Sequence, residues 1–145
     1  MINKGTTYAI GVILVHLALT LLHGLAHVHL GIGLTGAQEI FVAAVITVAP
    51  LVAGYLLWKG KQRIGGALLA VSMAGAFVFG IFYHFIAPGA DNVNHRFPLS
   101  PANWTRVFYQ TAGGIAGLEV LGLICGLMLV LKSERKGKES PNPST

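Results

Sequence analysis

The stretch that decides the fold is residues 8–30, YAIGVILVHLALTLLHGLAHVHL. At about 1.5 Å of rise per residue, a helix of this length crosses the roughly 30 Å hydrocarbon core of a bilayer. Three more apolar stretches of similar length follow, at residues 39–58, 65–87 and 106–131. We therefore predict an all-α integral membrane protein, with residues 1–131 forming one four-helix bundle.

The composition supports this class of protein. Hydrophobic residues make up 54% of the chain, charged residues only 10%, and the mean hydropathy is +0.68. Such a chain has too few polar side chains to cover a soluble surface. Lys4 before an apolar run is also typical of a signal peptide, but the run is long, carries histidines and shows no convincing cleavage site. We expect it to be retained as a span.

The basic residues predict the orientation of the bundle. Only Arg96 and Arg106 fall on one side of the predicted spans, and eight lie on the other: Lys4, Lys59, Lys61, Arg63, Lys132, Arg135, Lys136 and Lys138. Basic residues favour the cytoplasmic side, so both termini should be cytoplasmic in a multi-pass protein of the plasma membrane. The net charge of +5 then reflects topology and contact with anionic lipid, not nucleic-acid binding. Residues 132–145 should form a disordered polar tail.

Histidines are the most informative residues within the spans. His16, His23 and His27, together with Thr20, project within about 40° of one another on a helix, and His29 points elsewhere. Ionisable groups are costly in hydrocarbon and are usually retained there for function. This polar stripe is therefore a candidate functional surface, although histidines that only hydrogen-bond neighbouring helices would give the same pattern.

Depth along the helices brings further residues to the same leaflet. His27 and His84 should each lie about 5 Å inside the external ends of their spans, and His23 about 10 Å inside. Glu39 opens the second span on that side, and His95 lies in the external loop. Imidazole and carboxylate groups without thiolates suit zinc, copper or iron, so these five residues are predicted metal ligands. Gly24 after His23 excludes the HExxH motif of metalloproteases.

A b-type haem is an alternative occupant of the same region. It requires two imidazoles on facing helices at one depth, which His84 with His23 or His27 would provide. Gly24 and Gly80 would let the helices approach the macrocycle. Electron transfer or metal handling is then the predicted function.

A second polar pair lies deeper in the bundle. His16 and Glu119 should each lie about 20 Å from the external ends of their spans, where they could pair. A carboxyl at this depth can carry protons, and it can equally be a protonated group that hydrogen-bonds a neighbouring helix. The pair supports an alternative function, a proton-coupled transporter or channel.

A third possibility is a non-catalytic subunit or assembly factor. The fourth span carries two small-residue pairs on roughly opposite faces, Gly113 with Gly117 and Gly122 with Gly126, which predict packing between two other helices or in an oligomer. Cys125, the only cysteine, should be a packing residue. No nucleophile, phosphate loop or oxyanion arrangement supports an enzyme. The loop 88–105 is rich in turn formers and should cap the histidine cluster.

Overall fold

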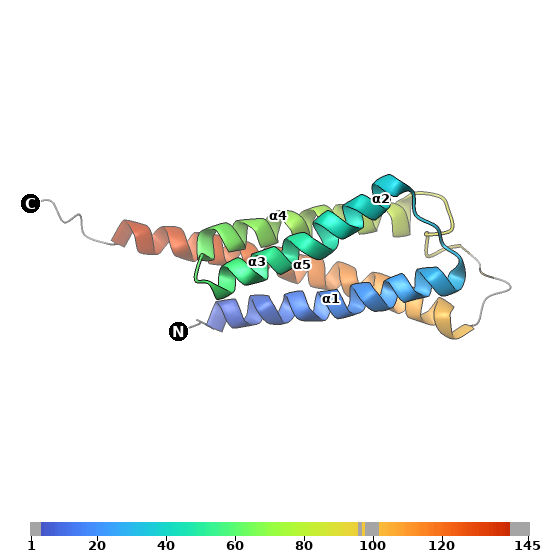
Figure 1. Ribbon diagram of the computed structural model, residues 1–145, viewed down its shortest axis with the longest axis horizontal. Coiled ribbons are helices and arrows are strands. Elements are labelled where there is room, and N and C mark those ends of the chain that lie inside the picture. The colour runs from blue at the N-terminus through green and yellow to red at the C-terminus, as the bar shows by residue number, and fades with distance from the viewer. Residues whose placement is uncertain (1–3, 96, 98–101, 140–145) are drawn as a thin grey trace, which may run out of the picture.

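The computed structural model describes residues 4–95, 97 and 102–139, and all the regular structure in this part of the chain is helical (Figure 1). The helical segments form four spans, each long and apolar enough to cross a membrane. In chain order they are α1 (Lys4–Leu30); α2 (Gly36–Phe41), η1 (Val42–Val48) and α3 (Ala49–Trp58); α4 (Gln62–Ile81) and η2 (Phe82–Ile86); and α5 (Ala102–Glu139).

The four spans lie side by side along the long axis of the molecule (Figure 1). The described chain ends, at the start of α1 and the end of α5, lie at the same end as the α3–α4 turn, and the α1–α2 connection lies at the other end with the α4–α5 loop. The predicted basic positions in the α3–α4 turn and at the two termini are therefore at one end of the bundle. Which compartment this end faces stays a prediction.

The outer surface of the bundle is apolar. Val28, Ile40 and Val71 are 70% or more exposed, and each belongs to a different span. A helix with apolar side chains on its outer face as well as its packed face is typical of a lipid environment. The interior near the termini is filled by a compact apolar cluster: Ala9, Ile13, Ala53, Leu57, Leu69, Met73 and Leu129.

Glycines set the close approach of α4 to α5. A Cβ atom on Gly126 would lie 2.6 Å from the Gly66 carbonyl oxygen and 2.7 Å from the Ala70 nitrogen. Gly122 faces Met73 in the same interface. Gly113 and Gly117 differ, because no described atom lies within 4 Å of a Cβ on either residue. One predicted glycine pair thus packs inside the bundle, and an external partner for the other pair stays a proposal.

All four spans begin three or four residues before their predicted starts, and two of the changed boundaries have a clear physical reason. The second span begins at Gly36 because Thr35 caps it, with its hydroxyl accepting from the Gln38 amide. At the other end of the chain, residues 132–139 of the predicted tail continue α5 as helix. Lysine, arginine and glutamate are good helix formers, and Glu134 lies 3.6 Å from Arg63 on α4. Residues 140–145 lie outside the described part.

Candidate metal centre

Three predicted histidines meet at the end of the bundle where the α4–α5 loop lies. His23 and His27 are one turn apart on α1, and their Nε2 atoms are 3.1 Å apart. The His84 ring from η2 lies with its centroid 4.9 Å from that of His23 and 6.1 Å from that of His27. Two separate spans therefore supply the imidazoles, as their estimated depths indicated.

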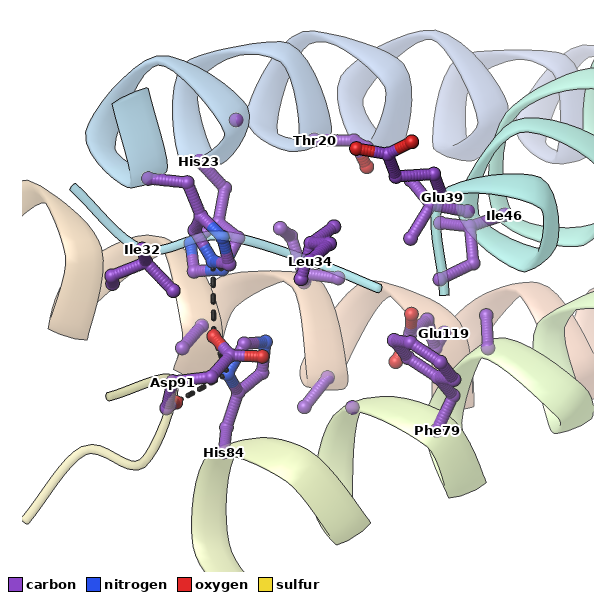
Figure 2. A pocket seen from close by; sticks show the side chains of 18 of the residues that line it. Thr20, His23, Ile32, Leu34, Glu39, Ile46, Phe79, His84, Asp91 and Glu119 are labelled. Carbon is purple, nitrogen blue, oxygen red and sulfur yellow. Dashed lines mark hydrogen bonds and ion pairs between the residues drawn. The ribbon is translucent and has the colours of Figure 1, made fainter. Parts of the chain in front are cut away.

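A fourth group completes the cluster from the loop after η2. The Asp91 Oδ1 atom lies 3.0 Å from both His27 Nε2 and His84 Nδ1 (Figure 2). One ligand atom from each of His23, His27, His84 and Asp91 can be chosen so that all four lie within 4.8 Å of one another. The set is three imidazoles and one carboxylate.

Backbone bonds hold Asp91 in this place. The Val93 amide donates to the His84 carbonyl at 2.9 Å, and the Asn92 side chain donates to the Ala87 carbonyl at 2.9 Å. The Asp91 carbonyl lies 2.9 Å from His84 Nδ1. The first part of the loop thus folds back onto the helix end that carries His84.

The helix end itself is widened. The Ala87 amide bonds to the Phe82 carbonyl, five residues earlier, at 2.7 Å, so residues 82–86 form a π-helical turn around His84. Such turns are rare and frequently occur at functional sites. The geometry of His84 therefore depends on this local irregularity.

Thr111 on α5 fixes the orientation of His23. The Thr111 hydroxyl donates to the Val107 carbonyl at 2.7 Å, so its oxygen accepts from His23 Nδ1, also at 2.7 Å. The proton of the neutral imidazole is then on Nδ1, and the Nε2 lone pair faces the cluster. This is the arrangement that metal-binding histidines usually have, with the second ring nitrogen held by a protein acceptor.

Phe108 is the apolar support of the cluster. It is fully buried, and its ring centroid lies 5.1 Å from that of His23, 5.6 Å from that of His27 and 5.7 Å from that of His84. A side chain packed against all three imidazoles limits their rotation. The cluster is therefore rigid enough to hold a defined geometry.

The distances match the spacing of ligands around one ion. Bonds of about 2.0–2.1 Å in a tetrahedral site separate neighbouring ligand atoms by about 3.3 Å. Three of the separations among His23, His27, His84 and Asp91 are 3.0, 3.0 and 3.1 Å, and one ligand atom from each residue can be chosen so that all four lie within 4.8 Å of one another. A proton on His27 Nε2 can be donated to only one of its two neighbours, His23 Nε2 or Asp91 Oδ1. Among the described residues, no donor meets Asp91 Oδ1 with hydrogen-bonding geometry. A shared cation would satisfy all these atoms at once.

The charge state of Asp91 suits a cation. Burial alone would raise the pKa of this carboxyl, but the imidazole nitrogens of His27 and His84 outweigh burial and hold the pKa well below its usual range. Asp91 is therefore ionised at neutral pH. It brings the one carboxylate to a site whose other three candidate ligands are imidazoles.

Two predicted ligands lie outside this cluster. Glu39 is exposed on α2 and is not among the clustered ligand atoms, and Figure 2 shows it apart from His23 and His84. His95 is exposed, with its ring against Phe97 and its carbonyl accepting from the Tyr109 hydroxyl at 3.0 Å.

Sequence reasoning also missed two residues of the site, Asp91 as a candidate ligand and Thr111 as the support of His23. Asp91 was recognisable as an acidic residue of the external loop, on the same side as His84. Nothing in the sequence distinguishes Thr111 from other threonines.

His29 behaves as expected for a residue off the polar stripe. It is exposed, and its ring stacks on Trp104 at a centroid distance of 4.0 Å. It is not among the clustered ligand atoms. His29 therefore provides a matched control for the three clustered histidines.

The deeper pair lies between α1 and α5. His16 Nε2 is 3.6 Å from Glu119 Oε1, and each residue is 1% exposed. This distance is too long for a good hydrogen bond. The two groups face each other without sharing a proton in optimal geometry.

A single cavity of about 320 Å³ joins the two regions. Its lining includes the cluster residues at one end and Thr20, Glu39 and Glu119 at the other (Figure 2). All four spans contribute to its wall. No protein-family model, curated protein or solved structure matches this chain.

Proposed function

We propose that this chain is a small integral membrane protein that binds one divalent transition-metal ion through His23, His27, His84 and Asp91. The observation that carries the proposal is the approach of four ligand atoms, from two spans and a loop, to within 4.8 Å of one another. The apolar outer faces of the four spans support the membrane location. Metal handling is the function that this arrangement fits best.

The donor set favours zinc among the candidates. Imidazoles suit Zn²⁺, Cu²⁺ and Fe²⁺, and a carboxylate with three imidazoles gives the four ligands that a tetrahedral Zn²⁺ site requires. The Thr111 contact to His23 is the kind of support that such ligands usually have. Zn²⁺ is therefore the ion to test first.

An ion fits the contacts better than the alternative of haem. A haem plane must separate its two axial imidazoles. Here Asp91 Oδ1 lies 3.0 Å from the nearest nitrogens of both His27 and His84, and His23 Nε2 lies 3.1 Å from His27 Nε2. Groups this close together leave little room for a macrocycle. Asp91 also adds an anionic ligand, which a bis-imidazole haem does not require.

The test is a metal titration of the purified full-length chain in detergent. At Zn²⁺ concentrations that fill only the tightest site, His84→Ala should remove most bound Zn²⁺, measured by equilibrium dialysis and elemental analysis, because it deletes the imidazole supplied by the third span. His29→Ala is the matched control and should leave binding within about twofold of the wild type, since its ring stacks outside the cluster. Equal binding by both variants would contradict the proposal, and a Soret band in the purified protein would favour haem.

A second candidate is proton-coupled transport through His16 and Glu119. The 3.6 Å approach of these two buried groups supports it, because intramembrane ionisable pairs often mark proton or ion paths. The two candidates are compatible, since one cavity reaches both sites.

A further inference from the structure

The acidic residues of this chain have an uneven distribution. The chain has five acidic residues and a net charge of +5. Glu39, Asp91 and Glu119 all line the one cavity described above, and the other two acidic residues lie near the end of α5. A basic protein that places three carboxylates in one cavity gives that cavity a local preference for cations.

Several buried polar atoms without hydrogen-bond partners line this cavity or lie next to its lining. Among the described residues, buried side-chain atoms without a partner are His16 Nε2, Thr20 Oγ1 and Glu119 Oε2, together with Asp91 Oδ1 in the outer cluster. Thr20 and Glu119 line the cavity, and His16 lies against Glu119. Unpaired buried polar atoms are costly, so a group of them indicates a ligand that pairs with them.

We propose that Glu119 and His16 form the core of a second binding site for a divalent cation, which reaches it from the outer cluster through the shared cavity that Thr20 also lines. The pair offers two carboxylate oxygens and one imidazole nitrogen, all acceptable to Zn²⁺. His16 Nε2 and Glu119 Oε1 are 3.6 Å apart, close to the separation of about 3.3 Å between neighbouring ligands of one ion.

The inner site should bind more weakly than the outer cluster. It has one imidazole where the outer site has three. A weaker inner site lets an ion leave, which a fixed structural site does not allow. The cavity with its two sites then has the form of an ion path, an interpretation that rests on the proposed function of the outer cluster.

The experiment counts Zn²⁺ ions bound to purified full-length protein by equilibrium dialysis, at Zn²⁺ concentrations that saturate both sites. The wild type should bind about two ions per chain, and Glu119→Gln about one, because the amide keeps the size of the side chain but loses its charge. Glu134→Gln is the control: it makes the same change at an exposed carboxylate of α5 and should still bind about two. His84→Ala should lose the tighter ion and keep the weaker one.

Glu119→Gln could disturb folding, which the thermal unfolding midpoint would reveal. His16→Gln is therefore a second variant, and it should also lose the weaker ion. The proposal is overturned if folded Glu119→Gln or His16→Gln still binds two ions, or if the wild type binds only one. If the wild type binds one ion and His84→Ala loses it, the proposal for the outer site still stands. A wild type that binds no Zn²⁺ would remove both proposals.

Discussion

Thr111→Val tests whether the outer site depends on a fixed histidine tautomer. Valine keeps the shape of threonine but removes the oxygen that accepts from His23 Nδ1 at 2.7 Å. The ring nitrogen then loses this acceptor, and the proton moves more readily to Nε2, where it competes with the ion. Loss of such a supporting group typically lowers metal affinity about 10- to 100-fold, or about 1.4–2.8 kcal/mol of binding free energy.

The assay is competition for Zn²⁺ between the protein and a chromophoric chelator, with the thermal unfolding midpoint measured in parallel. Thr105→Val is the control, because it makes the same change nearer the start of α5. We expect a weaker Kd in Thr111→Val and a Kd within about twofold of the wild type in Thr105→Val. Wild-type affinity in a folded Thr111→Val would refute the claim that Thr111 orients His23.

Three other outcomes follow from the packing, the topology and the deep pair. Gly126→Ala should lower the free energy of unfolding by about 1–3 kcal/mol, because its Cβ would meet backbone atoms of α4, and Gly113→Ala should have little effect in the same thermal unfolding assay. Asn94→Cys and Ser140→Cys should react with an impermeant thiol reagent from opposite sides of a sealed membrane, and labelling of both from one side would contradict the predicted topology. Glu119→Gln should abolish any ion-driven proton flux in proteoliposomes, measured with an internal pH dye, and flux equal to that of the wild type would exclude proton coupling through this carboxyl.

The sequence predicts the spans well because their driving force is local. Each span is a continuous apolar run, so its length and position can be read without knowing what it contacts. The runs at residues 8–30 and 65–87 match α1 (Lys4–Leu30) and the third span (α4 with η2, Gln62–Ile86) to within a few residues. The errors lie at the ends, where caps and charged helix formers extend the helix beyond the apolar run.

The site was predictable only in part, because its residues are defined by different kinds of information. His23 and His27 share a helix face, which follows from a spacing of four residues, and His84 could be matched to them by depth. Glu39 and His95 satisfied the same estimate of depth but lie apart from the cluster, because depth does not specify the direction of a side chain. The position of Asp91 depends on how a loop folds, which no helical periodicity describes.

The four candidate ligands are held in place by different parts of the structure. His23 and His27 belong to one long helix, and Phe108 packs against both rings, so these ligands are fixed by the bundle. Asp91 is held by contacts with His84 and by backbone bonds of its own loop. Among the four ligands it is the one whose position can change without repacking a span, and it brings the only negative charge. If an ion binds here, the segment that carries Asp91 is therefore the element through which its binding and release would be most directly linked.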